Sequence, residues 1–267
     1  MVKMVLMWGA ILLFTLTIHT ADSLSYALRL GGLRARRIGL ALSLAGMLLL
    51  VSRTSNMAQG PMIGRLVDHA KSAADGGGLA SGLHIVMAAA AAGTVLAMLL
   101  FPSVVRISAR LVVHLESAGS FPALLRRVLI PARLKNISFY IRLPRLYMVR
   151  TLLDGNLPRR LMVMNMTVTA IYTTGVLSSL YASYLWPAHS TSMSMSSGLI
   201  NGLATILLTL LIDPKLAILS ERSLRGELRL SQMNRTFGLM MCSRLAGTLL
   251  AQLLLVPFAY WLGWLLG

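Results

Sequence analysis

Five polar side chains share one face of the first apolar segment, where apolar surroundings would make each of them costly. Thr15, His19, Asp22, Tyr26 and Arg29 follow one another at intervals of four, three, four and three residues, which is the spacing of one helical stripe. Such a stripe is typical either of a hydrogen-bonded seam between helices or of the wall of a polar cavity.

A second polar group interrupts the apolar segment 38–58 and the residues just after it. Arg53 lies about 22 Å along a helix from the start of that segment, and Asn56, Gln59 and Pro61 follow it. Arg53 either extends to the membrane interface or points into a polar cavity, and its polar neighbours favour the cavity. Pro61 should end or kink the helix.

A third polar group occupies the last apolar segment, 237–266. Arg244 lies about eight residues into this predicted segment, and Gln252 follows on nearly the same helical face. An unpaired arginine there would be costly, so we predict a carboxylate partner, Asp213 first and Asp22 second. With His19, these two carboxylates are the predicted charge partners or proton relay.

The segment 197–219 carries one more polar stripe and two helix-shaping signals. Gly198 and Gly202 form a GxxxG pattern, which permits close approach of another helix. Pro214 frees the carbonyl of Leu210 and can kink the helix. The stripe has intervals of four residues and consists of Asn201, Thr205, Thr209 and Asp213.

The composition indicates the elements that must position these residues. Of 267 residues, 56% are hydrophobic and 12% are charged, against about 25% charged in soluble domains. The mean hydropathy is +0.73, so the sequence predicts an integral membrane protein. The net charge of +17 would suggest nucleic acid in a soluble protein. In a membrane protein it indicates basic loops that contact anionic lipid, and we expect no nucleic-acid partner.

Six apolar segments are long enough to cross a membrane. We therefore predict an all-α, polytopic membrane protein, multi-pass in a bacterial cytoplasmic membrane, with one transmembrane domain over 1–267. The predicted spans lie near 4–28, 38–58, 80–101, 161–186, 197–219 and 237–266.

The basic residues alternate between the segments that join these spans. Twenty of the 25 Lys and Arg fall in 29–37, 102–160 and 215–235. By the positive-inside rule these segments are cytoplasmic and both termini are outside. The segment 102–160 is basic and amphipathic, and prolines divide it into short helical pieces. It should lie on the inner leaflet, either as an anchor or to gather anionic lipid.

The sequence carries no motif of a hydrolase, a redox enzyme or a nucleotide-driven pump. HExxH, GxSxG, Walker A and GxGxxG are absent, and eight carboxylates leave little for paired acid catalysis. The single cysteine, Cys242, excludes a disulfide framework. We expect a protein that is not an enzyme, with no cofactor and no metal site.

Four stretches of this sequence resemble the bacterial Amj family, the lipid II flippases that act as an alternate to MurJ. They are residues 23–29, 51–61, 211–214 and 244–252, and the Ser-Arg-Thr-Ser-Asn run within 51–61 is the most specific. The resemblance implies movement of lipid II, the polyprenyl-pyrophosphate-linked peptidoglycan precursor, from the inner to the outer leaflet during cell-wall biogenesis. It does not itself identify binding residues.

The polar residues fit that role. Arg244 near the cytoplasmic side and Arg53 near the outer side are two cations that could hold the pyrophosphate before and after transit, because guanidinium forks match phosphate oxygens. The candidate substrate-binding residues are Arg53, Asn56, Gln59, Arg244, Gln252, Tyr26 and Arg29.

Two other classes of function stay open at this point. One is a proton- or ion-coupled carrier of a small solute, and the other is a membrane assembly protein that transports nothing. A laterally open groove would favour a lipid, a closed central site a small solute, and the absence of a cavity an assembly protein. Because six helices are few to enclose so large a headgroup, we also expect a homodimer.

Overall fold

The computed structural model describes residues 2–128, 141–144, 150, 152 and 158–267. Throughout this part of the chain the regular structure is helical and no strand occurs, which confirms the all-α prediction. The helices are α1 (Val2–Arg34), α2 (Ile38–Ala73), α3 (Gly76–Ala118), α4 (Phe121–Val128), α7 (Arg159–Leu185), η2 (Pro187–His189), α8 (Ser190–Leu207), the π-helical turn η3 (Leu208–Ile212), α9 (Asp213–Leu224) and α10 (Leu230–Leu266).

Six helical runs are long and apolar enough to cross a membrane, as predicted. They are α1, α2, α3, α7, the run Pro187–Leu224 and α10. Several are longer than their apolar windows. Helix α1 continues to Arg34, so Arg29 lies inside a helix rather than in a loop. The segment predicted as cytoplasmic from residue 102 begins within α3, which ends only at Ala118.

The extension of α3 has a packing reason. Beyond Pro102 a buried stripe continues at helical spacing, so tertiary contacts hold the helix together past its apolar window. The short α4 follows, and its Leu124 is buried in the cluster that joins α2 to α3. The predicted basic pieces around Pro131, Arg133 and Lys135 lie outside the described residues.

The two helix-shaping prolines behave differently. Helix α2 runs past Pro61 to Ala73, so of the two predicted effects of Pro61 the end of the helix is wrong, and the kink stays a prediction. Residues beyond it pack as a buried stripe that includes Ile63 and Leu66, which maintains the helix. At Pro214 the π turn η3 immediately precedes α9, at the place where the sequence predicts that the helix can kink. A π turn holds an extra residue and rotates the rest of the helix relative to the turns before it, so Thr209 is exposed and the predicted straight stripe is wrong.

Two pairs of helices pack with unusually close backbones. A Cβ on Gly93 of α3 would lie 2.5 Å from the carbonyl oxygen of Leu16 in α1. A Cβ on Gly247 of α10 would lie 2.5 Å from the carbonyl oxygen of Met166 in α7. Helix pairs α1–α3 and α7–α10 therefore depend on glycine at these crossings.

The GxxxG pattern of α8 does not pack in this way. A Cβ on Gly198 or Gly202 would meet nothing within 4 Å among the described residues, so no described helix makes the close approach that this pattern permits. Both glycines lie on the exposed side of α8. The homodimer stays a prediction of the sequence.

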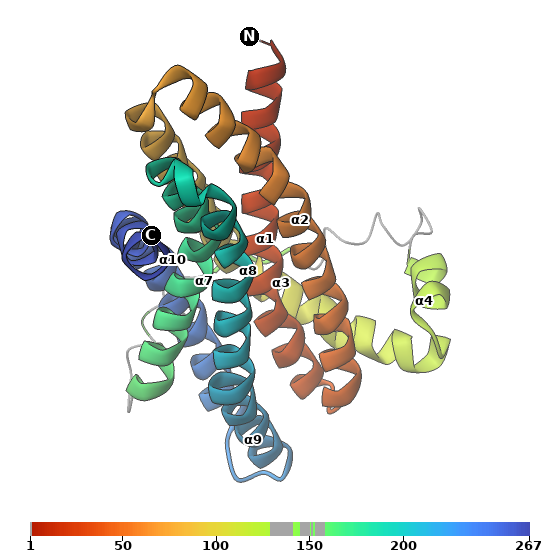
Figure 1. Ribbon diagram of the computed structural model, residues 1–267. Helices are drawn as coiled ribbons and strands as arrows, with labels where there is room; N and C mark the ends of the chain where they lie inside the picture. The colour runs from red at the N-terminus through yellow and green to blue at the C-terminus, as the bar shows by residue number, and fades with distance from the viewer. Residues whose placement is uncertain (1, 129–140, 145–149, 151, 153–157) are drawn as a thin grey trace.

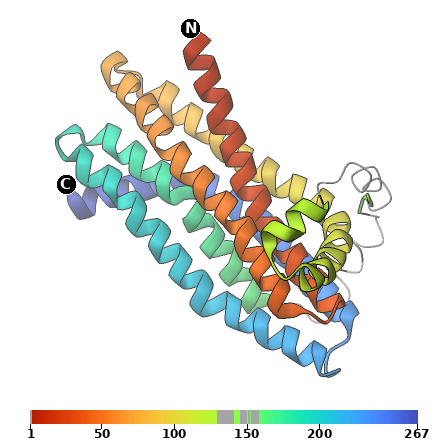
Figure 2. The same cartoon turned by 90° about the vertical axis from the view of Figure 1, so that its right-hand side faces the viewer.

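The loops gather at two opposite ends of the bundle (Figures 1 and 2). At one end Lys71 donates to Ser190 Oγ at 2.6 Å. At the other, Arg36 donates to the carbonyl of Leu224 at 3.2 Å. We call the first, which also holds the N-terminus, the neutral end. The second, with residues 35–37 and 225–229, is the basic end. The alternation of basic segments predicts this separation, and the neutral end is the one predicted to face outside.

A polar layer separates the apolar clusters of the two ends. One cluster surrounds Phe237 toward the basic end, and another surrounds Leu83 toward the neutral end. Between the apolar stretches of α2, its buried residues are all polar: Ser52, Ser55 and Gln59. The middle of α2 is therefore held to the bundle without buried apolar side chains.

Candidate functional site

Four functional candidates lie at one depth in the polar layer. His19 of α1, Arg53 of α2, Tyr172 of α7 and Arg244 of α10 are each about 20 Å along their helices from the basic end. Arg244 is fourteen residues into α10, because that helix begins at Leu230 rather than near 237. The predicted difference in depth between Arg244 and Arg53 is therefore wrong by this measure.

Arg244 forms a buried ion pair with Asp22. The Nη2 atom of Arg244 lies 2.8 Å from Asp22 Oδ2, and each side chain is 7% exposed. The second predicted partner is thus confirmed and the first, Asp213, is wrong. The pair uses a single contact, since Asp22 Oδ1 and Arg244 Nε are buried without a partner within the described part of the chain.

Asp213 pairs with Arg29 instead. Arg29 Nη1 lies 2.7 Å from Asp213 Oδ1, and the side chains are 14% and 33% exposed. Arg29 is seven residues after Asp22, about 10 Å along α1. Asp213 is therefore taken up by Arg29, and Arg244 is left to Asp22.

Tyr26 links α1 to α7 and α10 between the two ion pairs. Its hydroxyl donates to Asn165 Oδ1 at 2.9 Å. Asn165 Nδ2 in turn donates to the carbonyl of Met240 at 3.0 Å and to Ser243 Oγ at 2.7 Å. Sequence analysis missed Asn165, although an asparagine inside an apolar segment was an available signal.

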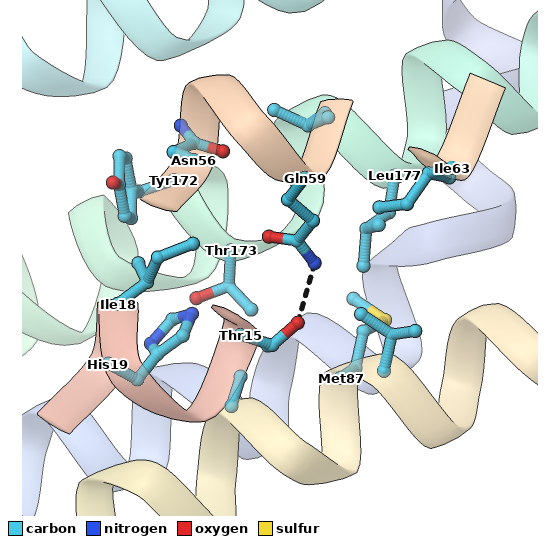
Figure 3. Close-up of a pocket in the computed structure, with 13 residues that line it drawn as sticks. Thr15, Ile18, His19, Asn56, Gln59, Ile63, Met87, Tyr172, Thr173 and Leu177 are labelled. Carbon is cyan, nitrogen blue, oxygen red and sulfur yellow. Dashed lines mark hydrogen bonds between the residues drawn. The ribbon is translucent and has the colours of Figure 1, made fainter. Parts of the chain in front are cut away.

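A small cavity opens between α1, α2, α3 and α7 beside this network (Figure 3). Its volume is about 30 Å³, room for about two water molecules. Gln59 Nε2 donates to Thr15 Oγ1 across it, while His19 Nδ1 and Thr173 Oγ1 have no partner among the described residues. Its polar lining comprises Thr15, His19, Asn56, Gln59, Tyr172 and Thr173.

This cavity is far too small to hold a sugar-peptide headgroup. The laterally open groove expected of a lipid carrier does not appear at this cavity. Sequence analysis singled out the α1 and α2 residues that line it. It missed Tyr172 and Thr173, whose types alone do not separate them from the other hydroxyl residues of α7.

Arg53 packs against Tyr172 of α7, nearly one helical turn before Asn56, which lines the cavity. Its Cζ atom is 5.3 Å from the centroid of the Tyr172 ring, a cation–π geometry. Its Nη1 donates to the Tyr172 hydroxyl at 3.4 Å. Arg53 is half-buried and turned toward a neighbouring helix, and it is not among the residues that line the cavity, so its predicted orientation into a cavity stays a prediction.

Gln252 is engaged elsewhere. Its Oε1 lies 2.8 Å from His84 Nδ1, and its Nε2 donates to the His84 carbonyl at 3.2 Å. Both ends of the amide therefore join α10 to α3 and leave little for a substrate in this conformation. His84 is a further residue that the sequence analysis did not single out.

Comparison with known proteins adds evidence from outside the chain. Residues 14–266 match the family model Amj, described as Alternate to MurJ. The chain is 41% identical over 254 residues to a protein named "Lipid II flippase Amj" from Bacillus subtilis (strain 168), with 94% of each chain covered. No solved structure matches. The matched residues include every site candidate described above.

Proposed function

Because this chain belongs to the Amj family, we propose that it is a lipid II flippase, which moves the polyprenyl-pyrophosphate-linked peptidoglycan precursor from the inner to the outer leaflet of the cytoplasmic membrane. Near-full-length identity to a relative of that name supports the assignment. Six helices able to span a membrane are consistent with it. Its role is transport rather than catalysis.

The observation that supports the proposal is the Asp22–Arg244 ion pair in the polar layer, which is made through one hydrogen bond only. Arg244 contacts Asp22 through one nitrogen, and its buried Nε donor is free within the described residues. A buried guanidinium with a spare Nε donor suits a ligand with several acceptor oxygens, such as pyrophosphate. A structural pair would gain from filling both contacts.

The arginines suggest an order of contact. Arg29 is nearer the basic end and its partner Asp213 is partly exposed, so a pyrophosphate entering from that end would meet Arg29 first. Arg244 and Arg53 would follow at mid-depth. The neutral hydrogen bonds would come from Tyr26, Asn56, Gln59 and Gln252, with His19, Asp22 and Asp213 as charge partners or relay.

Transport requires the closed cavity to open, and the middle of α2 is the most suitable place. Its contacts across the polar layer include Arg53 with Tyr172 and Gln59 with Thr15, which a polar headgroup can replace. The apolar clusters at the two ends of α2 would keep the helix attached. We propose that the headgroup enters between α2 and α7 while the polyprenyl tail stays in lipid.

Translocation of lipid II by purified protein in proteoliposomes tests the function. Arg53→Ala should abolish translocation and leave protein abundance near wild type, because the pyrophosphate loses a cation while the surrounding packing stays. Arg53→Lys should retain only part of the wild-type translocation, since a point charge lacks the guanidinium fork. Arg65→Ala is the matched control, as Arg65 is an exposed arginine of the same helix.

Three results would contradict these assignments. Absence of lipid II movement by the wild type would reject the flippase itself. Loss of abundance in Arg53→Ala would make Arg53 a structural residue. Wild-type transport by Arg53→Lys would show that charge alone suffices.

Two partners complete the proposal. Anionic lipids should gather at the basic end, around residues such as Arg106 and Arg126, and should co-purify with the protein. A homodimer should appear in mass measurements of the detergent-solubilised protein.

A further inference from the structure

Only one of the two carboxylate oxygens of Asp22 has a hydrogen-bond partner among the described residues. Its Oδ2 binds Arg244, while its Oδ1 is buried without a partner within the described residues. Removing a buried carboxylate from water is costly, and a single contact offsets that cost only in part. Asp22 in its charged form therefore depends on Arg244.

No other described cation is placed to replace Arg244 as the partner of Asp22. Arg29 is bound to Asp213, and Arg53 lies over the Tyr172 ring. Five helices contribute the charged and titratable groups around Asp22: His19, Tyr26 and Arg29 on α1, Arg53 on α2, Tyr172 on α7, Asp213 on α9 and Arg244 on α10. His84 of α3 is bonded to Gln252.

The approach to Asp22 is asymmetric. His19, nearly one helical turn toward the neutral end, lines the small cavity and has a free Nδ1 among the described residues. Toward the basic end the next turns of α1 enter the apolar cluster of Leu30 and Phe237. The cavity side offers a polar route to Asp22 through His19 and water, whereas on the other side Tyr26 and Asn165 are bonded to each other and Leu30 and Phe237 pack beside them.

We propose that lipid II binding is linked to uptake of one proton by Asp22, delivered from the neutral-end side. This inference rests on the proposed function. The pyrophosphate takes Arg244 away from Asp22, and the carboxylate left behind binds a proton and becomes neutral. When the lipid leaves, Asp22 returns the proton to the same side and pairs again with Arg244.

Linkage makes the expected result quantitative. Because the complex holds one more proton than the free protein, lipid II should bind more tightly as pH falls, by about tenfold per pH unit where the full proton is taken up. Adding lipid II to protein in a weakly buffered detergent solution should remove about one proton per chain from solution. A pH-indicator dye measures the uptake, and a binding titration across pH measures the affinity.

Asp22→Asn gives a result that a merely structural role would not produce. The neutral amide leaves Arg244 available at every pH, so binding should lose its pH dependence and the proton uptake should disappear. At neutral pH this variant should bind lipid II more tightly than wild type. Asp22→Glu should keep the uptake, and Asp68→Asn, the control at an exposed carboxylate of α2, should keep it as well.

The outcomes separate the inference from the function. Lipid II binding by wild type with no proton uptake would overturn the inference and leave the flippase intact. Uptake that persists in a folded Asp22→Asn would also overturn it. Failure of wild type to bind lipid II at any pH would reject both. If Asp22→Asn does not fold, the wild-type and Asp22→Glu measurements still decide the question.

Discussion

The two ion pairs of α1 have the same chemistry in different surroundings. Asp22–Arg244 is almost completely buried in the polar layer, whereas Arg29–Asp213, about 10 Å away along the helix, is partly open on its aspartate side. A buried pair is costly to break, since each partner left alone is a desolvated charge. A partly exposed pair can exchange its partner for solvent or substrate. Burial therefore makes the Asp22–Arg244 pair costly to break and leaves the Arg29–Asp213 pair easier to exchange.

The largest expected change in the free energy of unfolding comes from breaking the buried Asp22–Arg244 pair. Asp22→Ala should lower the free energy of unfolding by about 3–5 kcal/mol, because Arg244 keeps its charge without a partner. Chemical denaturation in detergent micelles measures the change. Replacing both members, Asp22→Leu with Arg244→Met, should recover most of the loss. A loss no larger than that of Asp68→Ala, an exposed carboxylate of α2, would show that the pair contributes little.

A smaller effect is expected at the partly exposed pair. Asp213→Ala should lower the free energy of unfolding by about 1 kcal/mol or less, because solvent and headgroups can stabilise Arg29. The same denaturation measurement compares the two variants directly. Equal losses for Asp213→Ala and Asp22→Ala would contradict the difference in burial on which the comparison depends.

The smallest expected effect on stability comes from introducing single cysteines into a Cys242→Ser variant. These cysteines report instead whether each position can be reached by a thiol reagent. Asp213→Cys should react with a water-soluble thiol reagent from the basic end, and Asp22→Cys should not. In intact cells, cysteines at Asp75 and His189 should be labelled from outside, and one at Lys135 should not. Labelling at Lys135 would reverse the predicted orientation.

Local patterns predicted the spans and the inward face of α1. A 20-residue apolar length and a 3.6-residue period are properties of one segment, so Thr15, His19, Asp22 and Tyr26 are buried as expected. The partner of Arg244 depends instead on how distant helices meet. Arg244 lies fourteen residues into α10, which begins at Leu230, and it meets Asp22 of α1, while Arg29 takes Asp213. The spacing of the charged residues along the chain does not reveal these pairings.

The glycines illustrate the same limit. The GxxxG pattern of α8 faces open space, while the close crossings use Gly93 and Gly247, which lack that pattern. A glycine permits close approach, but only the path of a second helix uses it. The cavity was also beyond sequence analysis, because its lining comes from four helices.

The close crossings at Gly93 and Gly247 have a mechanical consequence. Backbones in direct contact cannot slide past each other without separating, so α1 with α3 and α7 with α10 should each move as a rigid block. Asp22 belongs to the first block and Arg244 to the second. Their ion pair joins the two blocks, together with the Tyr26–Asn165 and His84–Gln252 hydrogen bonds. A ligand that replaced these polar contacts would let the blocks tilt apart without unwinding any helix.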